Sequence, residues 1–130
     1  MEDNVKLSLD PVTFEVIRGG FRYIPRRMFE SFQKMSFTTI IYEIADFSVS
    51  IYDKDVNLIG QNAGCPIHLG AMSFGTRACV EQFPDMEEGD AVVLNDPYAG
   101  GTHTPDITVV TPMFYEGKHC GYACARGHWI

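Results

Sequence analysis

Two strand-forming segments flank a short turn near the end of the chain and predict an antiparallel β-hairpin. Residues 107–114 are β-branched or apolar, and residues 119–127 alternate loosely enough to form a returning strand. The Glu116-Gly117 pair between them is typical of a tight turn. An antiparallel sheet is therefore the framework on which the rest of the chain must pack.

A candidate metal site lies at the open end of this hairpin. His103 and Asp106 are three residues apart in a segment too rich in Gly and Pro to form a helix. The hairpin register places His128 opposite Pro105, so this imidazole returns to within roughly 5 Å of Asp106 along the backbone. Residues three apart on a straight strand point to opposite faces, so a bend at Gly100, Gly101 and Pro105 is needed to bring His103 beside Asp106.

Two imidazoles and one carboxylate form a ligand set for a divalent cation. Imidazole suits Zn, Fe, Ni and Mn, whereas the carboxylate makes the site harder and compatible with Mn. Three protein ligands that leave coordination positions open suit a catalytic site better than a closed structural one. In the alternative interpretation, Asp106 caps a turn and His128 is a strand residue bonded to a backbone carbonyl. The spacing alone leaves both interpretations open.

The first part of the chain predicts a helix. Asp10 and Pro11 suit an N-cap and a first helical position. The apolar residues that follow recur at spacings of four and three, as in an amphipathic helix packed on a core: Ile17, Phe21, Ile24, Met28, Phe32 and Met35. Gly19-Gly20 and Pro25 weaken or kink this helix, so two helical pieces are an alternative to one.

Shorter segments complete the predicted fold. Residues 47–51 alternate as a strand with one buried face, and the chain then turns toward a second short strand near Leu58. Residues 67–83 predict a second helix, and residues 91–94 predict a short buried strand. The predicted fold class is α+β, an N-terminal amphipathic helix packed on a mainly antiparallel sheet built from hairpins.

Composition narrows the class of protein. At 130 residues, 45% hydrophobic and 21% charged, the chain corresponds to a single globular domain. The formal net charge of −7 argues against nucleic-acid binding, and no apolar run is long enough for a membrane span. The polar, acidic N-terminus excludes a secretory signal peptide.

The four cysteines contain no Cys-x-x-Cys pair, which excludes zinc-ribbon and thioredoxin sites. Without an export signal, a reduced, cytoplasmic setting is expected. Cys120 and Cys124 are an even number of residues apart on the predicted strand. They are therefore predicted to share one face as small buried side chains.

Further polar residues flank the candidate metal site. His68 stands at the start of the predicted helix 67–83, where it either hydrogen-bonds near the helix end or acts as a site residue. Asn95 and Asp96 follow the strand 91–94 and are candidates for orienting the ligands from outside the coordination sphere. No Gly-x-x-x-x-Gly-Lys loop is present, so a nucleotide phosphate would find no P-loop in this chain.

Several strings of residues resemble the hydantoinase B/oxoprolinase family. The most distinctive are Pro66-Ile67-His68-Leu69-Gly70-Ala71-Met72 and Gly100-Gly101-Thr102-His103-Thr104-Pro105-Asp106. The similarity runs in order from about residue 9 to the last residue, and it also includes residues 9–17, 46–48, 89–90, 95–98 and 127–128. The family includes ATP-dependent hydantoinase subunits, caprolactamase-like hydrolases, part of 5-oxoprolinase, and subunits of acetone and acetophenone carboxylases.

The resemblance implies a ligand set for a catalytic divalent metal (Zn, Mn or Fe). In the related carboxylases the metal is held by a His, an Asp three residues on, and a second His 25 residues after the first. His103, Asp106 and His128 repeat this spacing. His68 and Asp96 are then the candidates for catalytic roles, with His68 transferring a proton or binding the activated substrate.

The resemblance also implies partners. A hydantoinase A-like subunit would bind ATP and phosphorylate a small lactam or ketone substrate within a hetero-oligomer, with no part for nucleic acid or membrane. Opening of a cyclic amide such as a hydantoin or 5-oxoproline is the expected reaction. An acetone- or acetophenone-type carboxylase subunit and a non-catalytic assembly module are the alternatives.

Length is one departure from the family pattern. Members of the family are usually several hundred residues long and carry an Asp three residues after the second His, whereas this chain stops at Ile130. We therefore expect residues 1–130 to be a single domain, the N-terminal portion of a longer hydantoinase B-like subunit.

Overall fold

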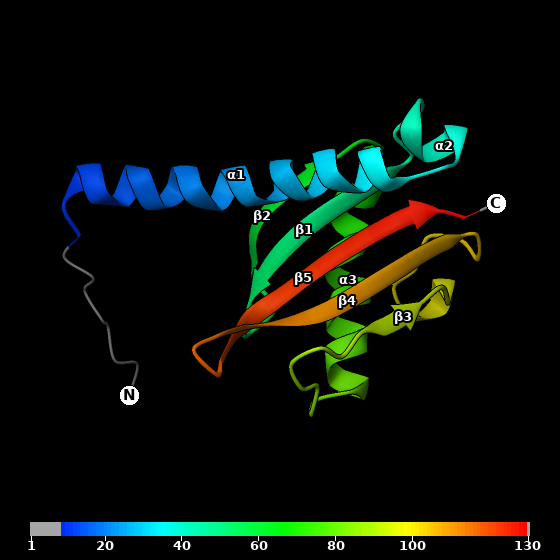
Figure 1. The fold of residues 1–130 in the computed structure, drawn as a ribbon. Coiled ribbons are helices and arrows are strands. Elements are labelled where there is room, and N and C mark those ends of the chain that lie inside the picture. Colours follow the sequence, from blue (N-terminus) through cyan, green and yellow to red (C-terminus); the bar gives the residue numbers. More distant parts are fainter. Residues whose placement is uncertain (1–8, 130) are drawn as a thin grey trace.

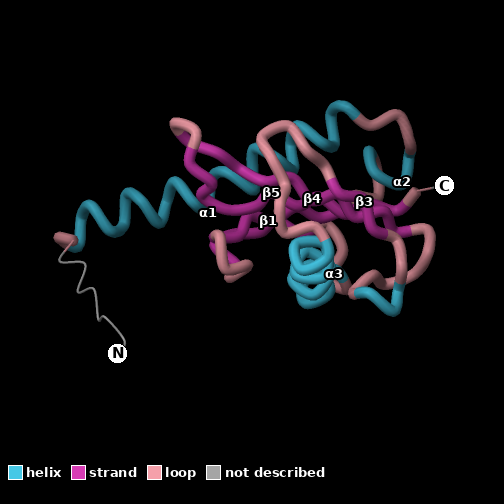
Figure 2. The backbone as a smooth tube through the Cα atoms, turned by 90° about the horizontal axis from the view of Figure 1, so that it is seen from below, coloured by secondary structure: helices cyan, strands magenta, loops and turns pink. Residues whose placement is uncertain are grey.

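The computed structural model describes residues 9–129. Its elements are, in chain order, α1 (Pro11–Met35), α2 (Thr39–Tyr42), β1 (Phe47–Asp53), β2 (Leu58–Ala63), α3 (His68–Gln82), β3 (Val92–Leu94), the 3-10 helix η1 (Pro97–Ala99), β4 (Asp106–Tyr115) and β5 (Lys118–His128). The strands form one antiparallel sheet in the order β2-β1-β5-β4-β3, with α1 on one face and α3 on the other (Figures 1 and 2). The predicted α+β class is confirmed.

The first helix is continuous, so the chain does not form the two helical pieces considered as an alternative. Asp10 caps α1 by accepting hydrogen bonds from the backbone N–H groups of Val12 and Thr13, at 3.1 and 3.0 Å. Pro25 lies inside the helix and is its fully buried residue. It packs over Gly60 of β2, where a Cβ would lie 3.1 Å from the proline ring. The proline is therefore accommodated by a packing contact with the sheet.

The apolar stripe of α1 packs on the sheet only in its C-terminal half. Met28 and Phe32 are partly buried against β1. Ile17, Phe21 and Ile24 remain 43%, 40% and 42% exposed, respectively. The N-terminal turns of α1 extend past the edge of the sheet (Figure 1). The periodicity therefore predicted the helix, but only part of the predicted contact is made.

The first strand is buried on both faces, whereas its alternating pattern predicted one buried face. Phe47 and Val49 pack toward α1. Ser48 and Ser50 point to the opposite face and are only 1% and 0% exposed, because α3 covers them. The Ser50 hydroxyl is satisfied by a 3.0 Å hydrogen bond to the Tyr52 hydroxyl. The polar residues of the alternating pattern in β1 thus form a second buried face, which lies under α3.

The β4–β5 hairpin turns at the predicted residues, but its register changes close to the turn. Phe114 faces His119 as predicted, whereas Met113 faces Gly121. Cys120 is therefore an extra residue in β5, which is the definition of a β-bulge. A bulge shifts all later pairs by one residue.

This shift corrects two predictions. His128 faces Asp106 directly, and not Pro105. Cys120 and Cys124 do not share a buried face, because Cys120 is exposed and Cys124 is buried. Both differences follow from the same extra residue.

The other predicted elements are present, with β2 beginning at Leu58, α3 within the predicted range 67–83, and β3 within 91–94. Between residues 9 and 129, no helix has the length and hydropathy of a membrane-spanning segment.

Candidate metal centre

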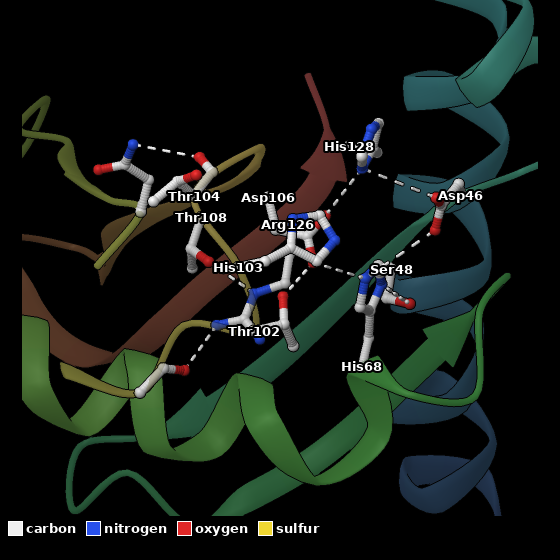
Figure 3. Close-up of polar contacts among 12 residues, drawn as sticks. Asp46, Ser48, His68, Thr102, His103, Thr104, Asp106, Thr108, Arg126 and His128 are labelled. Carbon is white, nitrogen blue, oxygen red and sulfur yellow. Dashed lines mark hydrogen bonds and ion pairs between the residues drawn. The ribbon is translucent and has the colours of Figure 1, made fainter. Parts of the chain in front are cut away.

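Polar residues of β4, β5 and the position just before β1 meet at one end of the sheet. The backbone N–H of His128 donates to the carbonyl of Asp46 at 3.0 Å, and His128 faces Asp106 across the hairpin. Directly opposed residues on antiparallel strands project from the same face. Asp46 and Asp106 both lie near the His128 imidazole, close to His68 at the start of α3 (Figure 3).

The three predicted ligand residues come together at this end of the sheet. Asp106 Oδ1 lies 3.4 Å from His128 Nδ1, and Asp106 Oδ2 lies 3.5 Å from His103 Nε2. Each of the three residues offers a potential ligand atom, and these atoms lie within 4.8 Å of one another. Asp106 is buried, whereas the side chain of His103 is half exposed. The arrangement is open to solvent on the His103 side.

The predicted bend is formed by the loop that precedes β4. The Asp106 backbone N–H donates to the His103 carbonyl at 3.0 Å, which closes a turn between the two residues. The Thr102 hydroxyl donates to Asp106 Oδ2. Gly100 has φ of 96° and packs against the backbone of Gly75 in α3, where a Cβ would lie 2.6 Å from the amide nitrogen. Glycine is needed at this position because the left-handed conformation and the close contact both exclude a side chain.

Two atoms of the cluster are buried without a hydrogen-bond partner. Among the described residues, Asp106 Oδ1 and His128 Nδ1 are both in this condition, and they face each other. Leaving a buried polar group unpaired costs about 1–3 kcal/mol, and more for a charged group. A cation that accepts lone pairs from both atoms would remove this cost, so the residues fit a divalent metal.

The protonation of the central carboxylate also suits a ligand role. Burial raises the pKa of Asp106, but the Thr102 hydroxyl and the neighbouring imidazoles together outweigh burial and hold the pKa below its ordinary value. Asp106 is therefore ionised at neutral pH. A carboxylate ligand must be deprotonated to bind a metal.

His68 lies in the same cluster as the three predicted ligand residues. The imidazole is 1% exposed, its Nε2 lies 3.4 Å from Asp106 Oδ2, and its Nδ1 lies 3.1 Å from the Ser48 hydroxyl. Burial lowers the pKa of His68, and the Asp106 carboxylate only partly opposes this effect. A neutral imidazole held from both sides is suited to positioning the carboxylate.

Asp96 and Asn95 shape the loop that carries His103. The Asp96 side chain accepts a 2.9 Å hydrogen bond from the Tyr98 backbone N–H and so caps η1. Asn95 Nδ2 donates to the Thr104 carbonyl at 3.2 Å. These contacts give both residues a supporting role near the ligands. Over residues 9–129, no hydrogen bond or ion pair joins the Asp96 side chain to the ligand residues.

Arg126 was not anticipated as a residue that supports the site. It is 0% exposed, and its guanidinium donates to Thr108 Oγ1 at 2.6 Å and to the Gly100 carbonyl at 2.9 Å. The guanidinium therefore ties β5 to the loop that carries His103. One sequence signal was available: Arg126 is two residues from His128, so both lie on the same face of the strand.

An apolar hollow of about 440 Å³ opens beside the cluster. It is lined by Phe32, Met35, Ser36, Phe37, Thr38, Ile41, His128 and Trp129. Among these residues there is no Asp, Glu, Lys or Arg. The hollow is suited to an uncharged, largely apolar group next to His128.

Fold and site together define an α+β domain with a His/Asp cluster at one end of an antiparallel sheet. Residues 10–130 match the hydantoinase B/oxoprolinase family, and the chain belongs to that family. It is 38% identical over 129 residues to 5-oxoprolinase 1 of Arabidopsis thaliana, covering 96% of this chain and 10% of the plant protein. It is 31% identical over 123 residues to the caprolactamase subunit beta of Pseudomonas jessenii, covering 93% of this chain and 21% of that subunit.

Solved structures show the same fold. The ATP-dependent caprolactamase of Pseudomonas jessenii superposes with a TM-score of 0.84 at 30% identity, over 94% of this chain and 21% of that chain. An acetone carboxylase in its nucleotide-free form superposes with a TM-score of 0.81 over 92% of this chain and 16% of that chain. Its identity is 21%, so this likeness concerns the fold alone. The chain thus spans about a tenth to a fifth of the length of the relatives it matches.

Proposed function

We propose that this chain provides the metal-binding part of an ATP-dependent hydrolase that opens cyclic amides such as hydantoins or 5-oxoproline. A hydantoinase A-like partner subunit would bind ATP and activate the substrate. The observation that carries the proposal is the buried Asp106 carboxylate, which lies 3.4 and 3.5 Å from two imidazoles of distant segments. The unpaired atoms destabilise the metal-free chain. The cluster is therefore better explained by binding a catalytic cation than by stabilising the fold.

His103, Asp106 and His128 would hold the cation, which is Zn, Mn or Fe by the chemistry of the ligand set. A bound divalent cation supplies Lewis acidity to a carbonyl oxygen and lowers the pKa of a water molecule toward 7. The half-exposed side chain of His103 leaves an approach from solvent. His68 acts on the ligand Asp106, because its imidazole is fully buried and lies 3.4 Å from that carboxylate.

The apolar hollow next to His128 would receive the carbon skeleton of the cyclic amide. Its lining contains no Asp, Glu, Lys or Arg, and its one imidazole, that of His128, would be occupied by the cation. A ring with an uncharged amide therefore suits it better than an ionised small molecule. This placement puts the substrate beside a ligand residue.

Sequence identity favours the hydrolase over its alternatives. The relatives at 38% and 31% identity are a 5-oxoprolinase and a caprolactamase subunit. The acetone carboxylase supports a carboxylase only through its fold, at 21% identity. The P-loop that binds ATP phosphates in many enzymes is absent from the sequence, which is consistent with ATP binding on a partner.

Metal analysis of the purified chain tests the site. We expect a stoichiometric transition metal at this site, so that His103→Ala loses one equivalent and His119→Ala loses none. His119 is an exposed histidine at the turn end of β5 and serves as the matched control. A metal-free chain that still assembles with its partners would support the assembly module and overturn the proposal.

Turnover by the complete complex tests the reaction. ATP with a hydantoin or 5-oxoproline should give ring opening. ATP with labelled bicarbonate and a ketone should give no incorporation. Bicarbonate incorporation without lactam turnover would instead identify a carboxylase.

A further inference from the structure

A second group of potential metal ligands lies directly beside the first. Asp46, Cys65 and His68 each offer one ligand atom, and these three atoms lie within 4.8 Å of one another. We propose that this second group also binds a divalent cation, with zinc preferred, so that the chain forms a two-metal centre. The inference extends the proposed metal site, and the two can fail separately.

Two carboxylates lie between the ligand groups and are oriented to join them. Asp46 Oδ1 lies 4.0 Å from His68 Nε2, while its Oδ2 lies 4.0 Å from His128 Nδ1. Asp106 Oδ2 lies 3.4 Å from His68 Nε2, while its Oδ1 lies 3.4 Å from His128 Nδ1. Each carboxylate therefore directs one oxygen to the His68 imidazole and the other to the His128 imidazole (Figure 3). This is the arrangement expected of carboxylates that bridge two cations about 3.5–4 Å apart.

The surroundings of His68 hold its ring in the orientation that a ligand requires. Ser48 Oγ lies 3.1 Å from Nδ1, so the Nδ1–H tautomer can donate to this hydroxyl and leave the Nε2 lone pair free. Metal-binding histidines commonly use the second ring nitrogen in this way, because the hydrogen bond fixes both tautomer and ring orientation. Nε2 is the nitrogen that faces Asp46 and Asp106.

The backbone brings the Cys65 loop against the segment that carries Asp46. The Gly64 N–H donates to the Phe47 carbonyl at 3.0 Å, and a Cβ at Gly64 would overlap the carbonyl oxygen of Ala45. Only glycine permits this approach. Cys65 is then partly buried, with access to solvent for an entering ion.

The chemistry of the second group differs from that of the first. One thiolate, one imidazole and one carboxylate are all established zinc ligands, and the thiolate makes the group softer than a His/Asp/His set. The first group is therefore the more tolerant of Mn or Fe, whereas the second should prefer Zn and Co. A difference in preference allows the two sites to be measured separately.

Cobalt titration of the purified chain, with a non-thiol reductant, tests the proposal. We expect two equivalents of Co²⁺ per chain and a thiolate-to-cobalt charge-transfer band in the near ultraviolet. Cys65→Ser should lose the band and one equivalent. Cys120→Ser changes an exposed cysteine outside the cluster. This control should keep the charge-transfer band and both equivalents of Co²⁺. His103→Ala should lose one equivalent and keep the band.

Protection of the wild-type thiol from alkylation provides a measurement that needs no variant. Zn²⁺ should slow modification of Cys65 at least tenfold without slowing that of Cys120. A wild-type chain that binds one equivalent, shows no thiolate band and leaves Cys65 unprotected overturns the second site. If that one equivalent is lost in His103→Ala, the first site stands. If Cys65→Ser loses metal and His103→Ala loses no metal, the second site is supported and the first is contradicted. A chain that binds no metal overturns both.

Discussion

Replacing Phe47 by Ala should weaken the packing of α1 on the sheet. The Phe47 side chain is 0% exposed, and its ring centroid lies 4.1 Å from that of Phe29 and 4.9 Å from that of Phe32. Truncating a buried Phe to Ala costs about 3–5 kcal/mol, with the larger values where the surroundings cannot close over the cavity. The fully buried part of α1 is limited to Pro25, so the helix can settle toward the sheet. We therefore expect a loss near the lower limit, about 3 kcal/mol.

Urea unfolding followed by circular dichroism measures this loss, with hydrogen exchange reporting on the α1 amides. Phe74→Ala is the matched control, because Phe74 is 71% exposed on α3. Its effect should stay within about 0.5 kcal/mol. The amides in the last turns of α1 should exchange faster in Phe47→Ala than in the control. A loss below about 1 kcal/mol would show that the aromatic cluster does not hold α1 to the sheet.

Three further results are expected. Gly121→Ala should lower the free energy of unfolding by about 3 kcal/mol in urea titrations, because its Cβ would overlap a backbone carbonyl of β1; an unchanged midpoint would contradict this packing. Iodoacetamide at pH 8 should modify the exposed Cys120 quickly and leave Cys124 unmodified, as judged by mass spectrometry, since burial raises the pKa of Cys124 to about 11. Thr102→Val should raise the pKa of Asp106 in the metal-free chain, measured by NMR titration, because it removes a hydroxyl donor; a constant pKa would mean that the hydroxyl does not stabilise the carboxylate.

Local signals in the sequence were sufficient to predict the elements. The Asp10-Pro11 pair marks the start of α1 because its side-chain cap and its fixed φ both act within one turn. The Glu116-Gly117 turn fixes where β4 and β5 reverse, because the turn chemistry is confined to those residues. The convergence of His103 and His128 on one region followed from this turn. These predictions needed no knowledge of distant contacts.

Properties that depend on tertiary packing were missed. The extra residue at Cys120 has one local signal, the neighbouring Gly121, but a glycine in a strand marks either a bulge or a close backbone contact. Which of these occurs is decided by how β5 fits against β1 and β4 together. The burial of Ser48 was missed for a similar reason, because alternation cannot show which layer covers a polar face. The contribution of Arg126 depends on its hydrogen bond to the Gly100 carbonyl, a contact between distant residues that a local pattern does not reveal.

The cluster at the end of the sheet draws its members from four separate parts of the chain, represented by Asp46, His68, the turn from His103 to Asp106, and His128. His128 joins the other members only when β5 is paired between β1 and β4. An ion that binds only the assembled cluster shifts the folding equilibrium by mass action. At one hundred times its Kd, such an ion adds about 2.7 kcal/mol to the stability of the native state. Cation supply during synthesis would then influence how much of the chain reaches its folded form.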